Sequence, residues 1–371
     1  MSLKNYSLIF IIIIIISYSI LEQIYICKPW RYPEMKIGFS QNYNGPGGAR
    51  SWIEAFSKYC ISKGHTVSYG FDDTVDVFCS VANLSTYKEL ELLKNKKIKI
   101  MQRLGAIYLP YNHPNPLLIK NKNDELKNLI SFADSIVYQS HFSKEVLFRS
   151  IYNGSEPNGD IIYNSANSNL FTPTGEKLPN KSNKKIILAA AYWGTPDTAT
   201  KSLNLLSNVI SHYSNKSDIE FWVLGRAFAA NQRSLSKLNF RNVSKLDLLN
   251  PIPRENMPTI LRSVDMVLHL KAHEGCSNMV IETMHTGTPL VGINSGSLPE
   301  LVKESALLAD CDNSLDNFPN VNLKDLIYKI DKTLSNLDFY SNKVLNQSKN
   351  FSYSLTYELY LKKLFELVNK T

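Results

Sequence analysis

Closely spaced cysteines are missing from this sequence of 371 residues. Its five cysteines stand far apart, at Cys27, Cys60, Cys79, Cys276 and Cys311. An odd number with wide spacing argues against a disulfide framework and a zinc site, and favours a reducing compartment. A nucleic-acid-binding signature is also missing. The net charge of +8 therefore indicates a solvated basic face, or anionic partners such as nucleotide diphosphates and acidic lipids.

One long stretch lacks charge, and it lies at the N-terminus, from Tyr6 to Leu21. As a helix it spans roughly 24 Å, short of a hydrocarbon core of about 30 Å. Extension to Ile26 reaches about 31 Å but includes Glu22. We predict a single-pass membrane anchor within residues 1–33. The alternatives are a cleaved signal peptide and a buried first strand.

The charges that flank this stretch predict its orientation. Lys28, Arg31 and Lys36 follow it, whereas Lys4 precedes it. An excess of positive charge marks the cytoplasmic side of a membrane span. The residues after the anchor are therefore expected in the cytoplasm, in agreement with the cysteine pattern.

Short apolar runs alternate with helical patterns after residue 34. In the first half we expect strands at 35–39, 65–71, 75–81, 97–102, 135–139 and 160–163, and helices at 51–62, 86–94, 124–133 and 143–150. In the second half we expect strands at 185–190, 219–224, 265–270, 289–293 and 306–308, and helices at 201–212, 254–262, 279–286, 323–337 and 352–368. Such alternation predicts βαβ units and parallel sheets.

The composition shifts between the two series. Residues 172–184 contain Pro173, Gly175 and Pro179 with few apolar residues, which is typical of a linker. The fold class is therefore α/β, with two Rossmann-like, doubly wound parallel-sheet domains at 34–171 and 185–338 facing a cleft. Ligands of such sheets bind beyond the carboxyl ends of the strands.

Two glutamates with seven residues between them follow a predicted strand of the second domain. Glu274 lies in the loop after the strand, and Glu282 lies on the next helix. The free N–H groups at the start of that helix, near Ser277 and Asn278, suit a diphosphate. A carboxylate on the helix can accept both hydroxyls of a ribose, and one at the loop tip can reach a sugar.

The residues around this pair complete a longer pattern. The segment is followed by G-T-P-L-V at 287–291 and by G-S-L-P-E-L-V at 296–302. This string resembles the retaining GT-B glycosyltransferases of the family-4 group (glycosyl transferases group 1), whose hallmark is E-x7-E followed by a G-x-P-x-V strand. The resemblance continues at A-D-S-I-V-Y-Q-S (133–140) and at I-Y-N-S-A-N (162–167), where Ser165 and Asn167 replace the family's usual glycine and aspartate.

The resemblance implies a GT-B fold and an activity. A sugar would pass from a UDP- or GDP-sugar to a glycan or lipid-linked acceptor with retention of anomeric configuration. The nucleotide sugar would be a co-substrate, and neither a metal nor another cofactor would be needed. The first domain would bind the acceptor and the second the donor. Residues 339–371, with Tyr357, Tyr360 and Leu364, match the family's closing helix, which crosses back to the first domain.

The resemblance and the strand-end rule together assign site residues. Glu274 is the expected catalytic residue, and the expected donor-binding residues are Lys201, Arg226, Gly275, Cys276, Ser277, Asn278 and Glu282. Gly47 and Gly48 belong to a loop that approaches the phosphate or the acceptor, and Arg103 and His113 are candidate acceptor contacts. His273 can tune Glu274, and Cys276 is interpreted as a small loop residue rather than a nucleophile.

One departure from the family pattern concerns the diphosphate. The family uses an arginine and a lysine in R-x4-K spacing. Lys201 fits the lysine, but Pro196 stands in the arginine's place. Arg226, at a predicted strand end, is the candidate substitute, and an ordinary surface arginine is the alternative.

Two other functions compete with this prediction. A metal-dependent transferase needs a D-x-D loop after a strand, and Asp310-Cys311-Asp312 matches the letters in an unsuitable place. The second is a degenerate binder of nucleotide sugars or glycans, which the missing arginine favours. Transfer or hydrolysis of a nucleotide sugar would exclude the binder.

Overall fold

The computed structural model describes residues 32–41, 48–105, 107–113, 115–152, 158–180, 182–193, 196–227, 238–248, 252–312 and 314–369. Both sheets belong to one unit, residues 35–371. The predicted membrane anchor and Gly47 lie outside the described residues. Within the described ranges, every helix is too short or too polar to cross a membrane.

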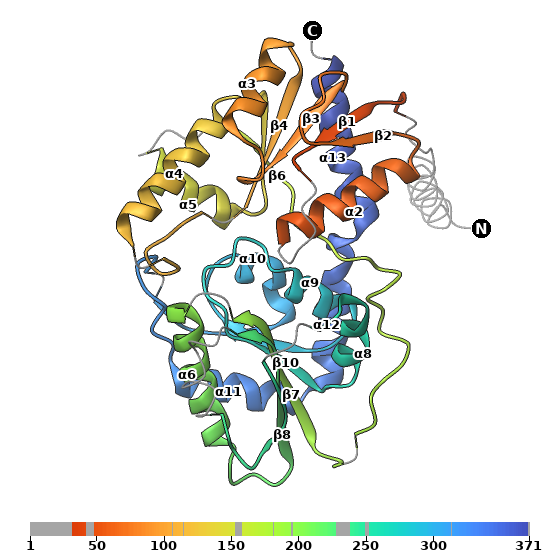
Figure 1. The fold of residues 1–371 in the computed structure, drawn as a ribbon. Coiled ribbons are helices and arrows are strands. Elements are labelled where there is room, and N and C mark those ends of the chain that lie inside the picture. Colours follow the sequence, from red (N-terminus) through yellow and green to blue (C-terminus); the bar gives the residue numbers. More distant parts are fainter. Residues whose placement is uncertain are drawn as a thin grey trace, which may run out of the picture. The chain divides into compact units, whose positions relative to one another are not determined.

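Six parallel strands form the first sheet, in the order β2-β1-β3-β4-β5-β6 (Figure 1). They are β1 (Lys36–Phe39), β2 (Thr66–Tyr69), β3 (Val77–Val81), β4 (Lys99–Leu104), β5 (Ser135–Tyr138) and β6 (Asp160–Ile161). β3 is buried along its whole length, as expected of a parallel strand with both faces covered. Because all six strands are parallel, their carboxyl ends meet at one edge of the first sheet.

Four helices connect these strands and form, with the sheet, the first lobe. They are α2 (Gly48–Ser62), α3 (Tyr87–Asn95), α4 (Pro116–Ile130) and α5 (His141–Ile151). α4 begins at Pro116, whereas the sequence pattern predicts a start at Asp124. The Asn115 side chain accepts hydrogen bonds from the N–H groups of Leu117 and Leu118. This cap and the proline at the first helical position set the earlier start.

The second sheet also has six parallel strands, in the order β12-β11-β10-β7-β8-β9. They are β7 (Lys185–Trp193), β8 (Ile219–Ala227), β9 (Val243–Asp247), β10 (Met266–His269), β11 (Leu290–Ile293) and β12 (Leu307–Ala309). The sequence analysis missed β9. As an edge strand it is largely exposed, so it lacks the apolar run that marked the others.

The helices of the second sheet complete the second lobe. They are α6 (Pro196–His212), η2 (Arg254–Asn256), α8 (Met257–Arg262), α9 (Asn278–His285), α10 (Leu298–Val302), η3 (Lys303–Ser305), α11 (Leu323–Leu334), α12 (Leu337–Ser348) and η4 (Lys349–Phe351). α10 and α12 were not predicted. α12 buries only Tyr340, Val344 and Ser348, and its Asn and Ser residues hide the helical period.

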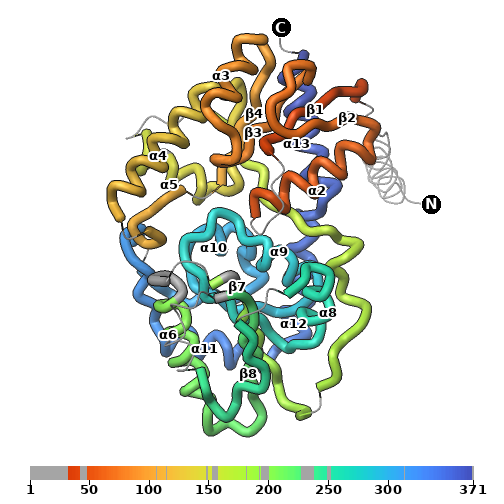
Figure 2. The backbone as a smooth tube through the Cα atoms, viewed as in Figure 1, coloured from red at the N-terminus to blue at the C-terminus, as the bar shows by residue number. Residues whose placement is uncertain are grey.

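The last helix, α13 (Tyr353–Asn369), returns to the first lobe and lies beside α2 (Figure 2). Aromatic side chains form the contact. The Phe56 ring lies 4.9 Å from Trp52, 5.2 Å from Tyr357 and 5.4 Å from Tyr360, between centroids. Nearby, Ala166, between β6 and the linker, pairs with Ser352 just before α13. Both connections between the lobes therefore run together.

Phe56 is fully buried in this aromatic cluster. We expect Phe56→Ala to lower the free energy of unfolding by about 3–5 kcal/mol, because it removes a large buried ring and leaves a cavity. Thermal unfolding followed by circular dichroism measures the effect. The control is Phe339→Ala on α12, where the ring is 54% exposed. Unfolding midpoints equal to wild type in both variants would refute the packing role of Phe56.

Candidate active site

The loop between β10 and α9 contains the predicted catalytic glutamate, and its backbone is tightly supported. His273 has a φ of +53°, which is unusual for a residue other than glycine. The turn after β11 lies against this loop, where the Ser297 N–H donates to the Glu274 carbonyl over 2.9 Å. A Cβ on Gly296 would come within 2.7 Å of the Glu274 nitrogen. Only glycine fits there, so the two turns fix each other.

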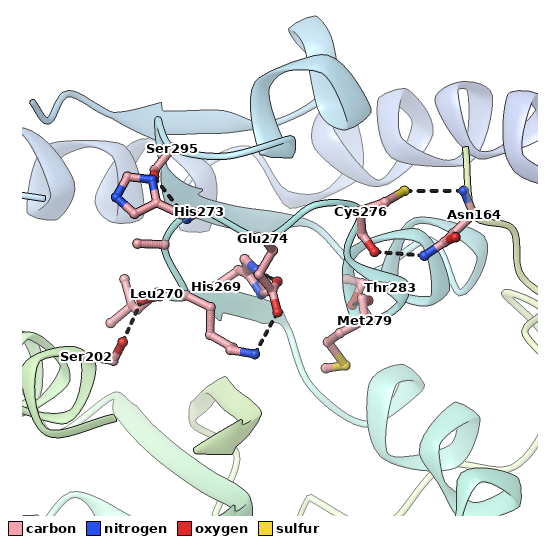
Figure 3. Close-up of polar contacts among 12 residues, drawn as sticks. Asn164, Ser202, His269, Leu270, His273, Glu274, Cys276, Met279, Thr283 and Ser295 are labelled. Carbon is pink, nitrogen blue, oxygen red and sulfur yellow. Dashed lines mark hydrogen bonds and ion pairs between the residues drawn. The ribbon is translucent and has the colours of Figure 1, made fainter. Parts of the chain in front are cut away.

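The Glu274 carboxylate lies between two cationic or donor side chains (Figure 3). The His269 Nε2 is 2.9 Å from one oxygen, and the Lys271 Nζ is 2.7 Å from the other. Burial raises the pKa of Glu274, but the Lys271 charge and the His269 hydrogen bond outweigh burial and hold it well below its ordinary value. Glu274 is therefore ionised, and His269 must donate its Nε2–H.

His273, expected to tune Glu274, contacts other groups. Its Nδ1 lies 3.0 Å from the Ser295 hydroxyl, and its Nε2 lies 3.3 Å from the Asn317 carbonyl. The Tyr111 ring packs edge-on against it at 4.7 Å, and the Phe142 ring stacks at 6.2 Å. In the described structure His269 therefore fills the position next to Glu274 that His273 was expected to fill.

The backbone N–H groups at the start of α9 have no side-chain cap from the N-cap residue. Ser277 is the N-cap residue, yet its side chain makes no capping hydrogen bond. A Cβ on Gly48 would lie 3.9 Å from the side-chain Nδ2 of Asn278. The first turn of α2 therefore meets the first turn of α9. Two helix N-termini close together favour an anion.

Cys276 lies in the same loop and is buried. Its sulfur accepts a hydrogen bond from the Asn164 N–H over 3.2 Å. Burial raises the pKa of the Cys276 thiol to about 12, so the thiol is protonated and is not a nucleophile at neutral pH. Gly275, one residue earlier, accepts a hydrogen bond at its carbonyl from the Ser143 hydroxyl of α5.

Glu282, one turn into α9, forms an ion pair that the sequence did not predict. Its Oε1 lies 2.6 Å from Nη2 of Arg254 in η2. The Glu282 side chain is only 9% exposed, whereas that of Arg254 is 38% exposed. Burial raises the pKa of Glu282 to about 7, although Arg254 opposes the rise.

The remaining predicted residues lie around this centre. Lys201 is exposed on α6, and its neighbour Ser202 donates to the Leu270 carbonyl over 3.0 Å (Figure 3). Arg226 is exposed near the end of β8, in register with Tyr192 of β7. Gly225 before it needs to be glycine, since its φ is +129° and a Cβ would lie 1.9 Å from the Ala191 carbonyl.

The two candidate acceptor residues differ in their surroundings. His113 is half-buried, with its ring 4.6 Å from the Tyr108 ring, and burial lowers its pKa. Tyr111 holds the His113 loop on the loop between β10 and α9 by donating to the Ala272 carbonyl over 2.8 Å. Arg103 is fully buried instead. An acceptor contact by either residue remains a prediction.

The sequence patterns did not indicate a role in the site for His269, Lys271, Tyr111, Asn164 or Arg254. Lys271 and His269 lie within five residues of Glu274, so their closeness in the chain was an available signal. Arg254 is 28 residues from Glu282, and no local pattern indicates such a pair.

A pocket of about 470 Å³ opens beside His273, and Arg149, Asn294 and Leu315 are among its lining residues. Glu300 closes one side of it. The Glu300 carboxylate accepts hydrogen bonds from the N–H groups of His141 and Phe142, each over 2.9 Å, and from the Tyr163 hydroxyl over 2.8 Å. The start of α5 is thereby capped by a carboxylate of the second lobe.

These two parallel six-stranded sheets form the GT-B glycosyltransferase fold. Sucrose-phosphate synthase from Thermosynechococcus elongatus superimposes with a TM-score of 0.71 at 14% identity, over 90% of this chain and 98% of that one. A glycosyltransferase from Rickettsia africae ESF-5 gives 0.68 at 16% identity, over 92% and 100%. Anabaena Alr3699/HepE in complex with UDP-glucose gives 0.64 at 15% identity, over 90% and 100%. Identities this low establish the fold alone.

A family model also matches the sequence of the second lobe. Residues 184–322 match the model of the family described as "Glycosyl transferases group 1". This range holds Glu274, Glu282 and the start of α9. A search of curated proteins gave no match.

The ionisation of Glu282 makes a testable contribution to stability. Its pKa is raised from 4.5 to about 7 in the folded state, so the folded protein binds this proton more tightly than the unfolded chain. Stability from this group is present below pH 4.5 and is lost as the pH rises through about 7. Glu282→Gln should therefore gain stability relative to wild type over that pH range.

Urea unfolding at several pH values measures this difference. Glu255→Gln is the control, because Glu255 is exposed in the neighbouring η2 helix. A pH-independent difference between Glu282→Gln and wild type would show that Glu282 ionises normally.

Proposed function

We propose that this protein is a glycosyltransferase that moves a sugar from a nucleotide diphosphate sugar to an acceptor, with retention of anomeric configuration. The observation that supports the proposal most strongly is the ionised Glu274, held by His269 and Lys271 just before the uncapped start of α9. In this proposal the carboxylate binds the donor sugar, and the helix end beside it binds the diphosphate. The match of residues 184–322 to a glycosyltransferase family supports the same activity.

The diphosphate is proposed to bind at the start of α9. The N–H groups of Ser277 and Asn278 and the helix dipole favour its negative charge. Lys201 on α6 and Lys271 add positive charge. Lys271 is 31% exposed and has two further N–H donors besides the one given to Glu274. We propose that Lys271 takes the role of the family's arginine, whose position in the sequence is occupied by Pro196. Arg226 on β8 is the less direct candidate for that role.

The nucleoside and the sugar are proposed to bind on either side of the diphosphate. Glu282 accepts the ribose hydroxyls, and Arg254 keeps part of this carboxylate ionised. Glu274 accepts hydroxyls of the donor sugar, because each carboxylate oxygen can accept more than the one hydrogen bond it already has. A UDP donor is supported by the HepE complex with UDP-glucose.

The chemistry follows from these positions. The bond between C1 of the sugar and the diphosphate oxygen breaks, and the acceptor oxygen bonds to C1 on the same face. The acceptor's proton passes to the leaving phosphate oxygen, so neither a protein base nor a metal ion is required. Fixed positive charge around the leaving group lowers the barrier by electrostatic stabilisation.

The acceptor and the location are proposed from the sequence. The uncharged stretch at residues 6–21 and the net charge of +8 favour a membrane-bound protein with its catalytic part in the cytoplasm. A glycan or lipid-linked acceptor close to the membrane surface fits that location.

A donor screen tests the proposal. The full chain is incubated with UDP- and GDP-sugars in EDTA, and release of UDP or GDP is followed with and without acceptors. Turnover with one donor, giving a product whose anomeric configuration by NMR equals that of the donor, is the expected result. Inversion would refute retention, and binding without turnover would favour a degenerate binding protein.

Glu274→Gln keeps the shape of the side chain but removes its charge. We expect kcat to fall by about 10²–10³-fold, because the charge that supports the developing positive centre at C1 is lost. Steady-state kinetics with the active donor measures the change. Glu304→Gln, at an exposed position, is the control and should be unaffected. A kcat of Glu274→Gln equal to wild type would remove Glu274 from the mechanism.

Lys271→Ala is expected to change the pH profile. Lys271 lowers the pKa of Glu274, so the wild-type carboxylate remains ionised far into the acidic range. Without Lys271 that pKa rises, and the acidic limb of kcat/KM should move to higher pH. The control, Lys324→Ala on α11, removes an exposed lysine. If the limb stays in place in Lys271→Ala, Lys271 does not set the ionisation of Glu274.

A further inference from the structure

Asn164, just after β6, makes two hydrogen bonds to Cys276 in the loop between β10 and α9, called the donor loop below (Figure 3), and a third to Asn278 at the start of α9. Its Nδ2 donates to the Cys276 carbonyl over 2.8 Å and to the Asn278 Oδ1 over 2.9 Å. Its backbone N–H donates to the Cys276 sulfur over 3.2 Å. Asn164 is buried, so water does not compete for these bonds.

Arg103 of β4 fixes which way the Asn164 amide points. Its Nη2 donates to the Asn164 Oδ1 over 2.6 Å. A guanidinium group can only donate, so the amide oxygen must face Arg103 and the NH₂ group must face the donor loop. A flipped amide would lose the bond to Arg103 and both bonds to the loop.

Arg103 itself is held rigidly and without a counter-charge. Its guanidinium stacks 4.2 Å from the Trp52 ring, and its Nε donates to the Tyr360 hydroxyl over 3.1 Å. The side chain is only 1% exposed, and Nη1 has no hydrogen-bond partner. Among the residues that the structure describes, no carboxylate forms an ion pair with it. A buried, unpaired cation costs stability.

The bond to Asn278 has a direct effect on α9. Ser277 is the N-cap residue of α9, and its side chain makes no capping hydrogen bond. Asn278 is the first helical residue, and its Oδ1 accepts from Asn164, outside the helix. The first N–H groups of α9 are therefore left for a ligand.

We propose that Asn164, oriented by Arg103, is a positioning residue that holds the donor loop and keeps the start of α9 open for the nucleotide diphosphate. This role rests on the proposed function, in which that helix end binds the donor. Asn164 does not touch the reacting atoms. Through Arg103, Trp52 and Tyr360 it connects the donor loop to β4, α2 and α13.

Two substitutions separate positioning from other effects. Asn164→Asp keeps the acceptor for Arg103, but its side chain cannot donate to the Cys276 carbonyl or to Asn278. Asn164→Leu removes all side-chain hydrogen bonds without adding charge. The control is Asn169→Asp, the same chemical change at an exposed position just before the linker. Arg103→Lys, combined with Asn164→Leu, forms a double-mutant cycle.

The test measures the Kd of UDP and of GDP by calorimetry with the full chain, together with donor and acceptor KM and thermal unfolding. We expect both Asn164 variants to bind the preferred nucleotide roughly 10- to 100-fold more weakly, as for the loss of two buried hydrogen bonds. Acceptor KM should change by less than about twofold, and Asn169→Asp should match wild type. Introduced into the wild-type protein, Arg103→Lys should weaken nucleotide binding. Introduced into Asn164→Leu, it should cause little further loss of affinity.

Wild-type affinity in Asn164→Leu would overturn the proposal, even if Asn164→Asp binds weakly, because added charge would then explain the loss. The proposal would also be overturned if the loss of nucleotide affinity in the Asn164 variants were fully explained by their larger unfolded fraction. Nucleotide binding by the wild type without any transfer would refute the transferase function, while the Kd values would still decide the role of Asn164.

Discussion

The ion pair between Glu274 and Lys271 lies where the two functional parts of the site meet. On one side is the Glu274 carboxylate, proposed to face the donor sugar, and on the other is the uncapped start of α9, proposed to bind the diphosphate. Both depend on a loop with a left-handed His273 and a turn at Gly296 that no larger residue fits. Because that backbone is fixed, His269 and Lys271 can hold Glu274 ionised in partly buried surroundings.

The site also depends on contacts between the lobes. Ser143 of α5 bonds to Gly275, Tyr111 bonds to Ala272, and Glu300 caps α5. The chain returns to the first lobe through α13, which packs on α2 by its aromatic rings. A change in how the lobes meet would therefore alter the backbone around Glu274 directly.

Much of the fold follows from periodic signals in the sequence. Strands such as β3 and β10 are continuous apolar runs, and the E-x7-E spacing indicated the helix that begins at Asn278. The edge strand β9 and the start of α4 were missed, because one is exposed and the other depends on a local cap. The pairs Arg254–Glu282 and Arg103–Asn164 join residues far apart in the chain. Only the folded structure brings such side chains together, so spacing could not predict them.

Hydrogen exchange of the full chain with and without UDP or GDP tests the central claim most directly, that the start of α9 binds the nucleotide diphosphate. We predict slower exchange of the backbone amides at 275–279 and at the start of α6 when the nucleotide binds. Protection confined to the pocket beside α5, at residues 141–149 and 294–300, would contradict the account and place the ligand elsewhere.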